Sequence, residues 1–283
     1  MAACARGGAD KLPDGSGGAD APGDGSGTPI DARPDAPIDA PPTGGPAQLL
    51  LTEVVLAPTG AEYIELVNPT AQAVALDRYY LSDHGAYFRV PTGAPAVDVT
   101  DFVVKFPAGA MIGPKAAITI AIDTAVIYQT SYGIPPTFSI ASGTMTAVST
   151  NGVASLTNTG EVIALFYWDG QDDRVRDVDL LLVGLASGVN GLIDKSGVAL
   201  DGPDADTTAT AYVTDARTIA AQPSAPGSAR STKRIALEAG QEVQGGTGNG
   251  LAGDDETSEN TAVTWDIAFT PPTPGVLPPG LIP

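Results

Sequence analysis

Two runs of acidic residues hold the side chains whose types and spacing most clearly suggest chemistry. Each run lies among glycines or prolines, which favour tight loops. Carboxylates gathered on such loops suit Ca²⁺, which takes roughly six to eight oxygen ligands in a flexible geometry. The candidate ligands are Asp201, Asp204 and Asp206 in the first run, and Asp254, Asp255, Glu256 and Glu259 in the second. The alternative is that both runs are solvated loops on an acidic protein.

The composition of these runs limits which ion they suit. Neither run matches the EF-hand loop, because the glycine and the bidentate glutamate of that motif are not at their places. Zinc is disfavoured because the chain has one cysteine and one histidine. A third acidic turn, Asp169-Gly-Gln-Asp172-Asp173, is expected to close a hairpin with Gly170 at positive φ. We therefore expect no cofactor other than a candidate Ca²⁺.

Nucleophilic catalysis has little support in the sequence. Ser82, Asp83 and His84 are the residue types of a catalytic triad, but triads are assembled from separated positions beside an oxyanion hole. The Gly-x-Ser-x-Gly pattern of a nucleophile elbow does not occur. We interpret His84 as a turn residue and predict that the chain is not an enzyme. The alternative is a secreted metal-dependent hydrolase that uses the acidic loops around its metal. Paired carboxylates for glycoside hydrolysis also stay open, because 33 acidic residues give many pairs.

The two tryptophans raise a further alternative, a carbohydrate-binding module with exposed stacking faces. A tryptophan at the end of a strand more often packs in the core or at its rim. Trp168 ends an apolar run. Trp265 lies in a segment where strand alternation would place Val263, Trp265 and Ile267 on one face. We interpret that face as core.

The charge balance bears on the class of partner. The net charge is −19, whereas binding nucleic acid requires clustered basic side chains that replace counterions. The most basic cluster is Arg230, Lys233 and Arg234. We therefore predict no nucleic-acid partner. We also predict no transmembrane helix, because no apolar run is long enough to span a bilayer.

Residues 1–47 differ from the rest of the chain. They are rich in Gly, Pro, Ala and Asp and have few large apolar side chains, which predicts a disordered tether. Ala2-Ala3-Cys4 resembles the end of a bacterial lipobox, whose cysteine carries the lipid. The charged and apolar segments that precede a lipobox are missing, so lipidation of Cys4 would require an upstream start. Otherwise Cys4 is an incidental tail residue.

Residues 48–276 show the pattern of an all-β domain. Short runs of β-branched, aliphatic and aromatic residues alternate with Gly, Pro, Asn and Asp turns. The expected strands include 48–55, 62–67, 79–82, 102–106, 116–122, 161–168 and 176–183. Within 62–67, alternation places Ile64 and Leu66 toward the core, and Glu65 toward the outside or a partner. A short helical turn is expected between Tyr128 and Tyr132, and residues 277–283 form a Pro-rich tail.

The order of several short phrases resembles the bacterial lamin tail domain, an immunoglobulin-like β-sandwich. The matching phrases include Leu51-Thr-Glu-Val54, Glu62-Tyr-Ile-Glu-Leu-Val-Asn68, Ser155-Leu-Thr-Asn-Thr-Gly-Glu-Val-Ile163, Asp177-Val-Asp179, Trp265 and Thr273-Pro-Gly275. The resemblance covers most of residues 48–276. Segments near 123–152 and 185–227 exceed what that family's core needs, and we interpret them as insertions.

The resemblance implies a structural or interaction module in the bacterial cell envelope or outside the cell, with no activity of its own. Together with Cys4, it leads us to predict a lipoprotein on the outer membrane or cell surface. The expected partner is an envelope or extracellular protein or a glycan, which the sequence does not identify further.

Overall fold

The computed structural model describes residues 49–185, 193–212, 222–237 and 260–281. All of these belong to the second of two compact units, Gly44–Pro283. The predicted tether, Cys4 and the second acidic run (Asp254, Asp255, Glu256 and Glu259) lie outside the described residues. No helix among the described residues is long and apolar enough to cross a membrane.

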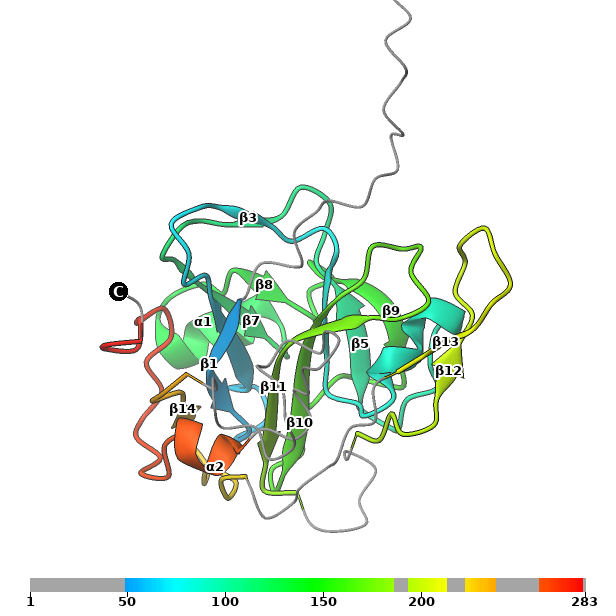
Figure 1. The fold of residues 1–283 in the computed structure, drawn as a ribbon. Coiled ribbons are helices and arrows are strands. Elements are labelled where there is room, and N and C mark those ends of the chain that lie inside the picture. The colour runs from blue at the N-terminus through cyan, green and yellow to red at the C-terminus, as the bar shows by residue number, and fades with distance from the viewer. Residues whose placement is uncertain (1–48, 186–192, 213–221, 238–259, 282–283) are drawn as a thin grey trace, which may run out of the picture. The chain divides into compact units, whose positions relative to one another are not determined.

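The described part of the chain is all-β, as predicted, and is built on two five-stranded sheets (Figure 1). In spatial order the first sheet has β14 (Thr232–Lys233), β1 (Leu50–Val55), β2 (Tyr63–Val67), β7 (Ala117–Ala121) and β8 (Phe138–Ser139). The second sheet has β11 (Arg176–Val183), β10 (Glu161–Tyr167), β4 (Tyr79–Ser82), β5 (Phe102–Lys105) and β9 (Thr146–Thr150). Neighbouring strands are antiparallel except β7 and β8.

Two small sheets and three short helices complete the described elements. The small sheets pair β3 (Val74–Ala75) with β6 (Met111–Ile112), and β12 (Ala199–Leu200) with β13 (Thr210–Ala211). The helices are η1 (Tyr87–Thr92), α1 (Ala125–Tyr132) and α2 (Thr261–Thr264). The helical turn expected at Tyr128–Tyr132 is therefore a longer helix. It begins after Thr124, whose hydroxyl accepts a hydrogen bond from the Ile127 N–H.

The two large sheets pack face to face as a sandwich. Their shared core takes Ile64 and Leu66 from β2, as the alternation predicts, and Ile163 and Leu165 from β10. The intervening residues of β10, Val162 and Phe166 among them, join a second apolar cluster on the outer face of the second sheet. Strands buried on both faces lose the simple alternation of apolar and polar residues.

The outer face of the second sheet is covered by η1 and by residues 193–212. Tyr87 and Phe88 of η1 pack there with Ile193 and with the half-buried Tyr212. The Tyr212 hydroxyl donates to the Phe88 carbonyl at 2.7 Å and accepts from the Val175 N–H at 2.9 Å. Part of the segment interpreted as an insertion is thus packed on the sandwich.

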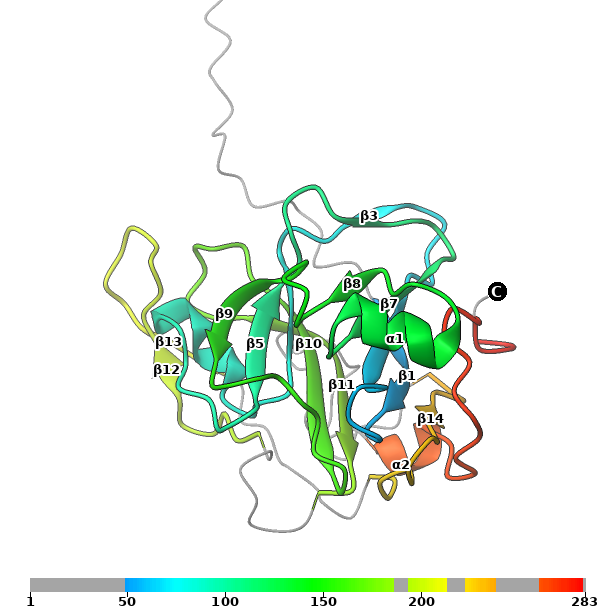
Figure 2. The ribbon, with the colours of Figure 1, turned by 180° about the vertical axis from the view of Figure 1, so that it is seen from behind.

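The outer face of the first sheet is covered as well. Tyr128 and Tyr132 of α1 meet the ring of Tyr63 edge-on at 5.7 and 5.2 Å between centroids, and Figure 2 shows α1 in front of this sheet. Glu65, on the same face as Tyr63, is fully buried. Glu65 lies on the outer face of the sheet, as the alternation predicts, but it does not reach the outside, because α1 and the C-terminal residues cover that face.

The expected strand around Trp265 is also wrong. Residues Thr261–Thr264 form α2, and Trp265 follows the helix in an isolated bridge to Arg234. Trp265 is buried in the shared core, as predicted, but Val263 and Ile267 are exposed. Helical geometry ends the period-two alternation on which the prediction depended.

Candidate metal site

Three carboxylates from two distant loops converge at one corner of the sandwich. Asp173 lies in the connection between β10 and β11, and Asp201 and Asp204 lie between β12 and β13. One carboxylate oxygen of each residue lies within 4.8 Å of those of the other two. The two loops are 28 residues apart at Asp173 and Asp201, so folding creates this arrangement.

Asp173 is held in place by hydrogen bonds from the neighbouring loop. Its Oδ1 accepts from the Gly202 N–H at 2.7 Å, and its Oδ2 accepts from the Thr210 hydroxyl. Both hydrogen bonds lower the pKa of Asp173 below its ordinary value, and the bond from the Thr210 hydroxyl contributes more than the bond from the Gly202 N–H. Asp173 is therefore a preformed anion beside the more exposed carboxylates of Asp201 and Asp204.

The approach of the two loops requires glycine at position 202. A Cβ on Gly202 would lie 2.8 Å from the Asp172 carbonyl oxygen and 2.9 Å from the Asp173 Cα. Both neighbours are backbone atoms, so neither can move aside cheaply. A larger residue would separate Asp173 from the β12–β13 loop.

Asp206 does not join this group, although the sequence placed it with Asp201 and Asp204. Its Oδ1 accepts from the Thr208 N–H at 2.7 Å, and its own N–H donates to Asp204 Oδ1 at 3.1 Å. Asp206 shapes the loop on which Asp204 lies. Asp173 is not among the ligands predicted from the sequence, where the Asp172-Asp173 turn is expected only to close a hairpin.

The site combines oxygen donors with nearby basic side chains. Three carboxylates, completed by backbone carbonyls and water, are the ligand type that Ca²⁺ prefers. Asp172 is a poorer candidate ligand than Asp173, because its carboxylate already pairs with Arg176 at 3.2 Å. Arg174 lies on the same turn, where its guanidinium donates to the Ala211 carbonyl at 2.9 Å. Its charge opposes a bound cation, so the three carboxylates must outweigh it.

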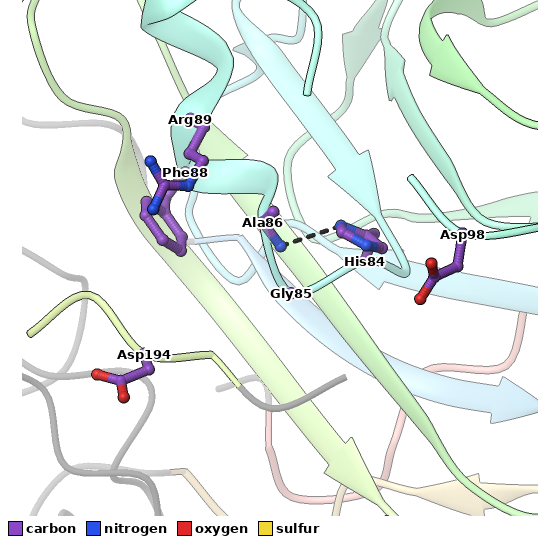
Figure 3. A pocket seen from close by; sticks show the side chains of 7 residues that line it. All are labelled: His84, Gly85, Ala86, Phe88, Arg89, Asp98 and Asp194. Carbon is purple, nitrogen blue, oxygen red and sulfur yellow. Dashed lines mark hydrogen bonds between the residues drawn. The ribbon is translucent and has the colours of Figure 1, made fainter. Parts of the chain in front are cut away.

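A second group of possible ligands, His84, Asp98 and Asp101, is a poorer metal site. Figure 3 shows the His84 ring fixed by a hydrogen bond from the Ala86 N–H, which reaches Nδ1 at 3.1 Å. Since Nδ1 accepts, the neutral ring carries its proton on Nε2, which faces Asp101 Oδ2 at 4.0 Å. Neither nitrogen then has a lone pair free for a metal.

The hydrogen bonds around His84 are those of a turn between two strands rather than of a catalytic triad. Ser82 Oγ accepts from the His84 N–H at 3.0 Å and donates to the Phe102 carbonyl at 2.9 Å. Asp83 Oδ1 accepts from the Phe102 N–H. Neither side chain has a hydrogen bond to the imidazole among these contacts. Asp98 and Asp194 both line the adjoining pocket of about 340 Å³, and Figure 3 shows their side chains apart from each other.

The tryptophans and two of the three basic residues pack within the structure. The Trp168 indole N–H donates to the Asp172 carbonyl at 2.8 Å, and the Arg234 guanidinium lies 5.0 Å from the Trp265 ring centroid. Among the described residues, the large exposed apolar side chains include no aromatic residue. Of the basic cluster, Arg234 is buried, Lys233 is half-buried and only Arg230 is exposed.

Glu53 and Glu65 form a pair of buried carboxylates, a pairing that the sequence pattern does not predict. They are opposite each other on β1 and β2, beside a pocket of about 290 Å³. Glu53 accepts from the Thr273 N–H at 3.0 Å, and Glu65 accepts from the Gly275 N–H at 2.6 Å. Burial, with the Glu53 charge as a smaller contribution, raises the pKa of Glu65 to about 7. These carboxylates hold the C-terminal residues on the sheet.

Comparisons with known proteins identify no family for the chain. No family model matches it, and no curated protein matches it. A solved structure that it resembles is a DUF4876 family protein from Bacteroides thetaiotaomicron, at 12% identity and a TM-score of 0.38. The match covers 84% of this chain and 72% of that one. The lamin-tail resemblance stays a prediction.

Proposed function

We propose that the chain is a non-catalytic cell-surface structural or interaction module, stabilised by Ca²⁺ bound between Asp173, Asp201 and Asp204. The observation that supports the ion is the convergence of these three carboxylates from two separate loops. A divalent cation at this position would offset their mutual repulsion. It would also fasten the β12–β13 loop to the connection between β10 and β11.

The non-catalytic part of the proposal is supported by how the polar side chains are used. Ser82, Asp83 and His84 are hydrogen-bonded within their own turn and to the backbone of Phe102 on β5. Glu53 and Glu65 bind backbone N–H groups of the C-terminal residues. These groups complete the fold, which fits a module whose role is to present a surface to an envelope or extracellular protein or glycan.

We propose attachment to the bacterial outer membrane through a lipid on Cys4, with residues 1–47 as the tether. This part depends on the sequence alone. It is tested by metabolic labelling of the source organism with a fatty-acid analogue, where wild-type protein incorporates the label and Cys4→Ser does not. Equal labelling of both, or of neither, would contradict the anchor.

Thermal unfolding of the full chain tests the Ca²⁺ site. The melting temperature should rise with CaCl₂ concentration from its value in EDTA, because an ion that binds only the folded state stabilises it. At a free concentration one hundred times Kd the gain is about 2.7 kcal/mol. The double variant Asp201→Asn/Asp204→Asn should lose this response.

Asp206→Asn is the matched control. It removes one negative charge from the same loop, and its amide oxygen can still accept from the Thr208 N–H. This variant should keep the Ca²⁺ response of the wild type. A melting temperature that CaCl₂ leaves unchanged in the wild type, or raises equally in the double variant, would exclude this site.

A further inference from the structure

Lys195 and Asp177 form an ion pair that is almost completely removed from water. Lys195 Nζ contacts Asp177 Oδ2, and their side chains are 4% and 2% exposed. Asp177 belongs to β11, and Lys195 lies 18 residues later in the segment that leads into β12. The pair thus connects the outer face of the second sheet to the segment that covers it.

Aromatic rings enclose the pair. Lys195 Nζ lies 5.5 Å from the ring centroid of Tyr87 and 5.6 Å from that of Tyr212. The ring of Phe166 packs against that of Tyr87, at 5.0 Å between centroids. The Tyr87 hydroxyl donates to Asp177 Oδ1 at 2.7 Å, so the second carboxylate oxygen also has a fixed donor. The reacting groups of an amine and a carboxyl are therefore held together in a dry, rigid site.

We propose that Lys195 and Asp177 join covalently, forming an intramolecular amide bond between Lys195 Nζ and Asp177 Cγ. Desolvation weakens the preference for the charged pair over the neutral one. A proton passing from the ammonium to the carboxylate gives an amine and a carboxylic acid, which are the nucleophile and the electrophile for this bond.

The step balances without any other reactant. Nζ attacks Cγ to form a tetrahedral intermediate, and the negative charge gathers on Oδ1, where the Tyr87 hydroxyl already donates. A second proton moves from Nζ to Oδ2, the Cγ–Oδ2 bond breaks, and one water leaves. The C=O bond forms again at Oδ1. The amide nitrogen keeps one hydrogen, and no electron donor or acceptor is needed.

Two other ion pairs of the chain show why this reaction is specific to Lys195. Arg234 and Asp179 are equally buried, but a guanidinium stays protonated and is no nucleophile. Lys233 lies 3.5 Å from Glu53, but its side chain is 22% exposed and its Nζ donates to the Pro271 carbonyl. Among these pairs, Lys195 and Asp177 alone combine an amine, a carboxyl and an aromatic enclosure.

Intact-mass spectrometry of the purified, folded full chain tests the proposal. The wild-type chain should be lighter than its sequence mass by one water, and a digest should contain one branched peptide joining Lys195 to Asp177. Asp177→Asn should lose one ammonia in place of water, because the leaving group changes. Lys195→Ala should have its full sequence mass, and Lys233→Ala, the matched control, should keep the loss of one water.

Fragmentation of the peptides separates this bond from other dehydrations. Asp-Gly sequences such as Asp169-Gly170 and Asp201-Gly202 can also lose water, by closing on their own backbone. A full wild-type mass, or a water loss that maps to such a sequence, would overturn the proposal. The wild-type spectrum decides the matter by itself, so the outcome does not depend on whether Lys195→Ala folds.

Tyr87→Phe tests the role assigned to the hydroxyl. This variant keeps the ring and removes the donor to Oδ1. In newly synthesised chain, followed by intact mass over time after a pulse of cell-free translation, the joined fraction should build up more slowly than in the wild type. The rate should fall at least tenfold if the hydroxyl stabilises the intermediate as one oxyanion donor does. An unchanged rate would show that the Tyr87 hydroxyl does not stabilise the intermediate. The role of Tyr87 would then be limited to the ring that packs against Lys195.

Discussion

Asp177 and Asp179 lie two residues apart on β11, yet their carboxylates bind partners on opposite faces of the second sheet. Asp177 accepts from Tyr87 on the outer face, and Asp179 accepts from the Leu51 N–H of the facing sheet. In a regular strand these residues would share a face. Here Asp179 pairs with Leu165 of β10 and Asp177 pairs with the next residue, Phe166, so Val178 is an extra residue on β11. This β-bulge turns Asp177 and Asp179 toward opposite faces.

The ion pair between Asp179 and Arg234 predicts a large loss of stability when Arg234 is replaced. Arg234 Nη2 lies 2.7 and 2.6 Å from the two Asp179 oxygens, and Nε donates to the Leu51 carbonyl at 2.6 Å. Arg234→Met leaves a buried carboxylate without its cation and should cost about 3–5 kcal/mol in the free energy of unfolding. Chemical denaturation measures this value.

A double variant checks the physical reason. Arg234→Met combined with Asp179→Leu removes both charges and should recover much of the lost stability. Arg230→Met, at an exposed position, should change the free energy of unfolding by less than about 0.5 kcal/mol. If the double variant is less stable than Arg234→Met alone, the unpaired charge is not the cause of the loss.

The buried Glu65 predicts a pH dependence of stability. Its pKa is raised from 4.5 to about 7 in the folded chain, so the folded state holds its proton more tightly than the unfolded state. The stabilisation is present below pH 4.5 and is lost as the pH rises through about 7. The full difference is about 3 kcal/mol, at about 1.4 kcal/mol for each pH unit.

Glu65→Gln should remove the contribution of Glu65 to the pH dependence of stability, because the amide does not ionise in this pH range. Its free energy of unfolding should fall less steeply than that of the wild type between pH 5 and 7, as urea denaturation would show. The groups that face Glu65, Glu53 and Lys233, stay in place. Asp77→Asn removes an exposed carboxyl and should keep the wild-type slope. Parallel curves for wild type and Glu65→Gln would contradict the prediction.

Replacing Gly160 should destabilise the fold for a steric reason alone. This residue comes just before β10, where a Cβ would lie under 3.0 Å from the carbonyl carbon and oxygen of Gly184 and from the Leu185 nitrogen. Gly160→Ala should therefore destabilise the fold by about 1–3 kcal/mol. Gly227 also lacks a positive φ, and nothing lies within 4 Å of its Cβ position. Gly227→Ala should be neutral or slightly stabilising, and equal melting temperatures for the two variants would count against the steric reason.

The pattern of residues predicts much of the fold because it reports burial along each strand. The runs around Ile64 and Ile163 identify β2 and β10, since their apolar side chains point to a common core. The burial of Glu65 is not predicted, because its cover includes the segment at Gly275, 210 residues later in the sequence. Local alternation holds no information about such a distant segment.

The candidate site could be predicted only in part for a similar reason. Asp201 and Asp204 are visible as a local acidic run, but Asp206 belongs to the same run and turns toward Thr208. Asp173 joins the group through Gly202 and Thr210, a contact that exists only after the two loops meet. Likewise, nothing in the spacing of Asp177 and Lys195 indicates that they face each other.

The short outer strands of the first sheet limit how that sheet can grow. β14 and β8, at its two edges, are each two residues long. An added strand from another molecule needs a row of free backbone donors and acceptors, and such short edges offer few of them. Intermolecular extension of this sheet, the first step toward fibrils, is therefore disfavoured by the architecture itself.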